Sequence, residues 1–199
     1  MFEDIATQDP TGFLTAVTEQ LAKLPSQLWR TGNDGFAGIA TAMDALAVQV
    51  ECTRVGLVQE AETRGVVDQS PSPSPADWLL THSAHLEPAD AARTVDLAQL
   101  CQQPANQVIA SAVSGGTVTL RKAMTALRQL AQVEHHLAPG KREEALASLT
   151  LMAQTGYDRH VIAVGRTLMS LVGAERSLER NETALRALSS LRLAPWRTA

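Results

Sequence analysis

The sequence feature that most constrains the fold is an apolar stripe whose members recur at alternating spacings of three and four residues between Gly35 and Arg64. This spacing is typical of a long amphipathic α-helix. Gly65 is suited to end it, because glycine tolerates the left-handed backbone conformation of a helix C-terminus. We therefore predict a helix of roughly 30 residues, about 45 Å long and the longest in the chain. The stripe consists of Phe36, Ile39, Met43, Leu46, Val50, Thr53 and Leu57.

The stripe supports two interpretations. It can be the core-facing side of a spine helix around which a bundle packs. It can instead be a coiled-coil-like seam between two copies of the chain, because a seven-residue apolar repeat keeps facing its partner. The sequence leaves both open. The residues of the predicted dimer seam are Phe36, Ile39, Met43, Leu46, Val50 and Leu57.

The rest of the chain also predicts helices. Alanine and leucine dominate while aromatics make up 4% of the residues, a balance that favours helices over sheets. Asp9-Pro10, Ser74-Pro75 and Glu87-Pro88 mark helix starts, since proline is favoured at the first helical position. Further along, we expect Thr117 to cap a helix and Gly173 to close another, before a separate last helix.

These patterns predict an all-α fold, a multi-helix bundle with one long spine helix and several short helices. We expect an N-terminal helix and turn at residues 1–32 and a helical domain at 33–199. The two cysteines, Cys52 and Cys101, match no metal or redox spacing and fall within helical patterns, so we expect them to be reduced and buried.

Charge is distributed unevenly along the chain. Residues 1–114 hold 14 acids and 5 bases, a net charge of −9, and residues 115–199 hold 7 acids and 12 bases, a net charge of +5. Such an asymmetry suits either a nucleic-acid-facing side or two halves that dock on each other. Glutamates interleave with the later arginines, so salt-bridged, solvated helices are the alternative to DNA contact. The candidate nucleic-acid-binding residues are Arg121, Lys122, Arg128, Arg159, Arg166, Arg176 and Arg180.

Residues 74–100 have the outline of a helix-turn-helix, but their charge argues against DNA reading. The second helix carries Glu87, Asp90 and Asp96 against Arg93 alone, and phosphates repel such a face. Plain helix packing is the favoured interpretation of this pair.

No residue pattern predicts catalysis. His82 and His85 lie three apart, a conceivable metal clasp, but surface histidines explain them better, and Gly115-Gly116 lacks the lysine of a phosphate-binding loop. We expect no catalytic site, cofactor, metal or small-molecule ligand. The acidic start of the chain and the lack of a long apolar run predict a cytoplasmic protein without a membrane span.

A family resemblance supplies the functional expectation. Its residues are Arg64-Gly65, Ser74–Leu79 with its Trp-Leu pair, Leu86–Arg93, and Pro104 followed by Gly116–Thr119. In order and spacing, the stretch from Gln49 to Val172 resembles the domain-of-unknown-function 222 family, also called the 13E12 repeat family, of actinobacteria and their mobile elements. The sequence Tyr157-Asp158-Arg159-His160 stands where that family has a Thr-Pro-type helix start.

In that family the helical region commonly precedes an HNH nuclease module, and this chain stops before any such module. The resemblance therefore implies a non-catalytic accessory domain of an HNH-type endonuclease that assists DNA association. The alternative is a structural module that dimerises through the long helix and binds no nucleic acid.

Overall fold

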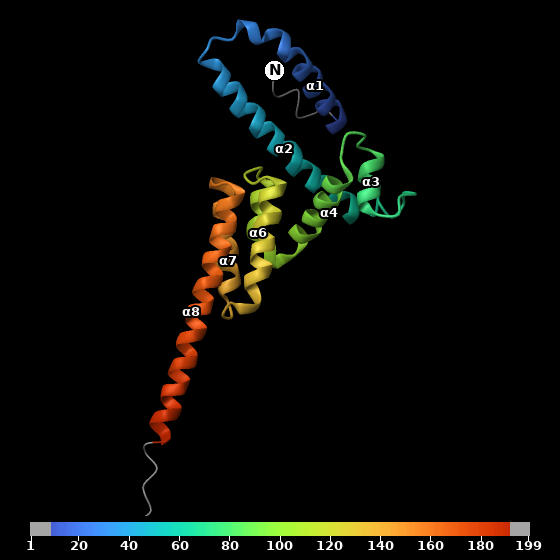
Figure 1. The fold of residues 1–199 in the computed structure, drawn as a ribbon. Coiled ribbons are helices and arrows are strands. Elements are labelled where there is room, and N and C mark those ends of the chain that lie inside the picture. Colours follow the sequence, from blue (N-terminus) through green and yellow to red (C-terminus); the bar gives the residue numbers. More distant parts are fainter. Residues whose placement is uncertain (1–8, 192–199) are drawn as a thin grey trace, which may run out of the picture. The chain divides into compact units, whose positions relative to one another are not determined.

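The computed structural model describes the backbone of residues 9–191 and the side chains of residues 9–173, 182 and 183. Over this range the fold is all-α, and the described residues contain no strand (Figure 1). The α-helices are α1 (Pro10–Lys23), α2 (Gly35–Thr63), α3 (Pro75–Thr81), α4 (Pro88–Gln102), α5 (Gln107–Ser114), α6 (Leu120–Val133), α7 (Lys141–Thr155) and α8 (Asp158–Leu191). Short 3-10 helices are η2 (Leu24–Arg30), η3 (Pro104–Asn106) and η4 (Glu134–His136).

The chain divides into two compact units, Met1–Leu46 and Ala47–Ala199. The division falls inside α2, whereas the sequence suggested a boundary after residue 32. In the first unit, Pro10 opens α1 and Pro25 accompanies the change from α- to 3-10 geometry. None of the described residues 9–46 is buried. The described part of this unit therefore has no hydrophobic core of its own.

The second unit is built around α6, which packs against α4, α5, α7 and α8. Figure 1 shows α6, α7 and α8 running side by side. The face of α6 toward its neighbours follows helical spacing, as the sequence predicts. The largest fully covered apolar side chains of the unit include Leu79, Leu97, Ile109, Leu130, Leu146, Leu149 and Val161.

The long helix predicted from the apolar stripe is present as α2, but a different face of it is buried. Its buried residues are Cys52, Val55, Val58 and Ala61, which join the core of the second unit. The stripe residues Val50 and Leu57 are instead about half exposed. The expectation that the stripe packs into the bundle is therefore wrong, because the core takes the neighbouring face of the same helix.

Two glycines that were expected to end helices behave differently. Gly65 has φ of 68°, and the N–H of Val66 donates to the carbonyl of Ala61 at 2.9 Å, so it ends α2 as predicted. Gly173 lies inside α8, which has 34 residues and is longer than α2 with 29. A mid-helix glycine costs roughly 1 kcal/mol relative to alanine, which is too little to end a helix by itself. The predicted break at Gly173 is therefore wrong.

None of the helices in the described part of the chain is both long and apolar enough to cross a membrane.

Candidate nucleic-acid interface

Three of the predicted cationic residues meet at one cleft. Arg121 and Lys122 lie in the first turn of α6, and Arg159 lies at the start of α8. The cleft is open and has a volume of about 490 Å³. The fold therefore brings together cations from distant parts of the sequence. We call this surface the cationic cleft; it is lined by Thr119, Arg121, Lys122, Tyr157, Asp158 and Arg159.

The start of α6 is set by a turn and a cap. Gly116 has φ of 64°, the left-handed conformation that glycine adopts without strain. Thr119 is the N-cap, and its Oγ1 accepts a hydrogen bond from the backbone N–H of Lys122 at 3.3 Å. The prediction that Thr117 caps this helix is wrong, since its hydroxyl donates to the carbonyl of Ala112 at 3.0 Å. After the left-handed turn at Gly116, three residues, Thr117 to Thr119, precede the first helical residue, Leu120.

The start of α8 places an exposed aromatic ring at the cleft. A Cβ on Gly156 would lie 2.9 Å from the carbonyl oxygen of Met152, so the tight link from α7 suits glycine alone. Tyr157 follows and is 68% exposed. Its ring makes an edge contact with the ring of His160, and the guanidinium of Arg159 lies 5.3 Å from its centroid. These two contacts orient the ring beside the cations.

An ion pair joins the two helix starts. Nε of Arg121 lies 2.5 Å from Oδ2 of Asp158. The other carboxylate oxygen, Oδ1, is buried and accepts no hydrogen bond from the described residues. Asp158 thus orients Arg121 and couples α6 to α8.

The electrostatics of the cleft favour an anion. Arg121, Lys122 and Arg159 against Asp158 give its lining a net charge of +2, within a chain whose net charge is −4. The first turns of α6 and α8 both lie at the cleft, and each helix N-terminus carries a partial positive charge of about half a unit. N–H groups at such ends can bind phosphate and carboxylate groups. At α6 two of them are already used within the protein: the N–H of Leu120 donates to Oε2 of Glu51 at 3.3 Å, and that of Lys122 donates to the Thr119 cap.

The other predicted nucleic-acid-binding residues do not line this cleft. Arg128 lines a separate cavity of about 270 Å³ between α4 and α6. Arg166 is exposed on α8, seven residues after Arg159 and therefore on a similar side of that helix. The side chains of Arg176 and Arg180 lie outside the described residues.

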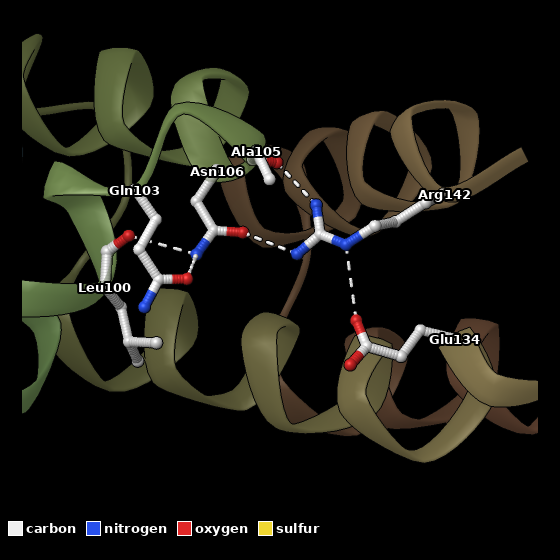
Figure 2. A network of polar contacts seen from close by, with 6 residues as sticks. All are labelled: Leu100, Gln103, Ala105, Asn106, Glu134 and Arg142. Carbon is white, nitrogen blue, oxygen red and sulfur yellow. Dashed lines mark hydrogen bonds and ion pairs between the residues drawn. The ribbon is translucent and has the colours of Figure 1, made fainter. Parts of the chain in front are cut away.

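Arg142, another base of the cationic half, has a structural role (Figure 2). Its guanidinium donates to Oε2 of Glu134 at 3.2 Å, to Oδ1 of Asn106 at 2.8 Å and to the carbonyl of Ala105. Asn106 is buried, and its amide donates to the carbonyl of Leu100 at 3.0 Å. The network links the start of α7 to the segment after α4. The guanidinium of Arg142 is therefore bound by other groups of the protein.

The predicted dimer seam lies on the surface of α2. In heptad terms its first-position residues are Phe36, Met43, Val50 and Leu57, which are 46–54% exposed. Ile39 and Leu46, between them, are half-buried. Each of the six predicted seam residues therefore keeps some apolar surface in contact with water.

The helix-turn-helix outline is present as α3 and α4, and α4 is used mainly for packing. Ser74 caps α3 by accepting from the N–H of Asp77 at 3.1 Å, as its sequence predicts. Six residues of α4 are buried, and Arg93 pairs with Asp90 at 2.8 Å. The structure thus agrees with helix packing as the role of this pair.

Both cysteines are free and buried, as predicted. Burial, and then the neighbouring Cys52, raises the pKa of the Cys101 thiol to about 11. Burial, and then Glu51, raises the pKa of Cys52. Protonated thiols of this kind are poor nucleophiles. Among the described residues, no group of three or more His, Cys, Asp or Glu side chains is placed to hold a metal ion.

Tyr157 and Thr119 are cleft residues that sequence reasoning missed. A lone tyrosine and a lone threonine carry no periodic signal, and only the joining of the two helix starts gives them a shared surface. The family resemblance marked Tyr157 only as a departure from the expected helix start.

Comparison of this chain with protein-family models, with curated proteins and with solved structures found no match.

Proposed function

We propose that this chain is a non-catalytic helical accessory domain that associates with nucleic acid through the cationic cleft. One observation carries the proposal: Arg121, Lys122 and Arg159 converge where the N-termini of α6 and α8 meet. Cations and helix N-termini together are the groups that proteins use to hold phosphate oxygens. The association with an HNH-type endonuclease rests on the family resemblance of residues 49–172.

The expected contact is to the phosphate backbone and is weak. Each neutralised phosphate on duplex DNA contributes roughly −0.9 to the slope of log K against log salt. Two or three contacts therefore predict a slope of about −2 to −3. We assign no helix to the reading of base sequence. The second helix of the helix-turn-helix outline, α4, carries Asp90 and Asp96 after its N-cap Glu87 and is packed against the core.

The test is fluorescence anisotropy with labelled random-sequence DNA, both as a duplex and as a single strand, and the full chain, at salt concentrations from about 20 to 200 mM. We expect binding at low salt that weakens with the stated slope. Lack of any anisotropy change at the lowest salt, with a folded protein, contradicts the proposal. The alternative is then the structural module that dimerises through the long helix.

A second candidate function is self-association along α2, favoured by a separate observation. Phe36, Met43, Val50 and Leu57 repeat every seven residues and are about half exposed. The flanking positions are mostly small and neutral, including Ala40, Ala42, Ala47 and Gly56. A second copy would therefore meet no like charge along most of the stripe, although residues 1–114 have a net charge of −9.

The size of the stripe fits a modest dimer. Covering its exposed apolar surface in both copies removes on the order of 1,000 Å² from water, which is near the lower limit for a specific interface. The described residues 9–46 have no buried member, so a partner would also supply the core they lack.

Light scattering of the full chain over a range of concentrations tests the second candidate. We expect a dimer that Met43→Asp converts to a monomer, because the substitution places a charge on the seam. Leu151→Asp is the matched control, since Leu151 is 61% exposed and belongs to α7 rather than to α2. A monomer at all concentrations, or equal effects of the two substitutions, contradicts self-association along α2.

A further inference from the structure

One component of the cationic cleft has no role in holding phosphate: the exposed ring of Tyr157. It is 68% exposed in a chain in which aromatics are 4% of the residues. Its ring lies at 63° to the ring of His160, and the guanidinium of Arg159 lies 5.3 Å from its centroid. The cleft thus presents an exposed aromatic ring next to its cations.

We infer that the cationic cleft binds single-stranded nucleic acid, with a phosphate held by Arg121 and Lys122 and an unpaired base stacked on Tyr157 beside Arg159. The inference rests on the proposed nucleic-acid association and names the form of nucleic acid that the cleft takes.

A tyrosine ring at the protein surface can stack only on a base whose face is exposed. In a duplex, the neighbouring base pairs cover both faces of each base, so a ring at the surface has no base face to stack on. In single strands the bases can be splayed out, and they stack on aromatic rings and on arginine guanidinium planes. The guanidinium of Arg159 lies over the ring of Tyr157, 5.3 Å from its centroid, so the two groups form one stack to which a base can be added.

Because the net charge of the cleft is small, base stacking must supply its preference for one form of nucleic acid. The lining has a net charge of +2, because Asp158 pairs with Arg121. Two phosphate contacts on a single strand give a salt slope of only about −1.4. Backbone contacts of this size do not separate one form of nucleic acid from another, whereas loss of a stacking aromatic weakens binding roughly 5- to 150-fold.

The cleft has room for this arrangement. It is an open depression with a volume of about 490 Å³, so one nucleotide can lie against it without being enclosed. Tyr157 comes directly before α8, and Arg121 and Lys122 lie in the first turn of α6. The aromatic ring and the phosphate-binding groups therefore come from different helix starts.

The chain also offers a matched control. Trp29 is 77% exposed, and the guanidinium of Arg30 lies 4.9 Å from the centroid of its ring. It has the same combination of exposed ring and arginine as Tyr157 but does not line the cationic cleft. If exposed aromatic rings bound bases without regard to place, Trp29 would contribute as much as Tyr157.

The experiment is anisotropy at low salt with the full chain and three labelled ligands of equal length: oligo-dT, a single strand of abasic sites, and a duplex. The protein is tested as wild type, Tyr157→Ala, Tyr157→Phe and Trp29→Ala. We expect oligo-dT to bind at least fivefold tighter than the abasic strand. Tyr157→Ala lowers oligo-dT affinity to the abasic level, and Tyr157→Phe and Trp29→Ala retain it.

Equal affinities for oligo-dT and the abasic strand, or an unchanged affinity in Tyr157→Ala, overturn the inference while leaving backbone association intact. Tighter binding of the duplex does the same. Binding to none of the three ligands overturns both the inference and the proposed function.

Discussion

Nε of Arg121 and Oδ2 of Asp158 lie 2.5 Å apart, so one ion pair links the first turns of α6 and α8. The side chain of Arg121 is 78% exposed, and that of Asp158 is 25% exposed. Solvent screens such a pair, which holds its contribution to stability to about 0–1 kcal/mol. Its larger effect is on the charge of the cationic cleft, because Asp158 offsets one of the three positive charges there.

We therefore predict that Asp158→Asn tightens nucleic-acid binding. The substitution keeps the shape of the side chain and raises the net charge of the cleft from +2 to +3. The slope of log K against log salt should steepen by roughly 0.7 to 0.9, the contribution of one more phosphate contact. Asp90→Asn is the control, since Asp90 pairs with Arg93 on α4, outside the cleft. Equal slopes in the two variants would show that the cleft is not the contact surface.

Arg142→Ala should destabilise the fold without changing nucleic-acid binding. The substitution leaves the buried Asn106 without the donor to its Oδ1 and removes the pair with Glu134. An unsatisfied buried acceptor costs about 1–3 kcal/mol, measured as the change in free energy of unfolding in urea. Lys141→Ala, which removes an exposed contact to Glu144 in the same helical turn, should cost less than about 0.5 kcal/mol. Similar losses in both variants would argue against the structural role of Arg142.

Two glycines of α8 should respond to alanine with opposite signs. A Cβ on Gly165 would lie 2.9 Å from Cβ of Gln129 on α6, so Gly165→Ala forces the two helices apart at a cost of about 1–3 kcal/mol. A Cβ on Gly173 meets nothing within 4 Å, so Gly173→Ala should stabilise the protein by about 0.5–1 kcal/mol. Thermal unfolding of both variants decides this, and a stabilising Gly165→Ala would refute the close packing of α6 on α8.

Stability should fall at high pH through Cys101. Its pKa is raised from 9.0 to about 11 in the folded protein, so the unfolded thiol ionises first as pH rises. The contribution is complete below pH 9 and is lost between about pH 9 and 11. It amounts to roughly 2–3 kcal/mol, at 1.4 kcal/mol per pKa unit. In Cys101→Ala, urea unfolding should show a shallower loss over this range, and an identical slope would exclude this thiol as the cause.

Much of the fold could be predicted because local chemistry sets its helix boundaries. Pro10, Pro75 and Pro88 each open a helix, and Gly65 ends α2 in a left-handed conformation. At these points a single residue restricts the backbone whatever lies around it. Gly173 shows the limit of this reasoning: a glycine permits a helix end but does not impose one, and α8 continues through it.

The burial of α2 and the composition of the cleft could not be predicted, because both depend on packing between distant segments. The stripe from Phe36 to Leu57 has the stronger period, yet the core covers the face that carries Val55 and Val58. Likewise, nothing in the local sequence of Arg121 indicates that Asp158 lies beside it. The sequence therefore identifies a positively charged half of the chain. Only the tertiary structure shows that Arg121, Lys122 and Arg159 lie at one cleft.

We propose that the cationic cleft, rather than the positive charge of the chain in general, binds nucleic acid. The most direct measurement compares the affinity of a labelled single strand at low salt for two triple variants that lower the net charge of the chain by the same three units. The cleft variant carries alanine at Arg121, Lys122 and Arg159. The control carries it at Arg64, Arg93 and Lys141, which lie in exposed ion pairs outside the cleft. We predict that the cleft variant loses at least tenfold in affinity and that the control stays within about threefold of wild type. Equal losses in the two variants, or no binding by the wild type, would contradict the claim.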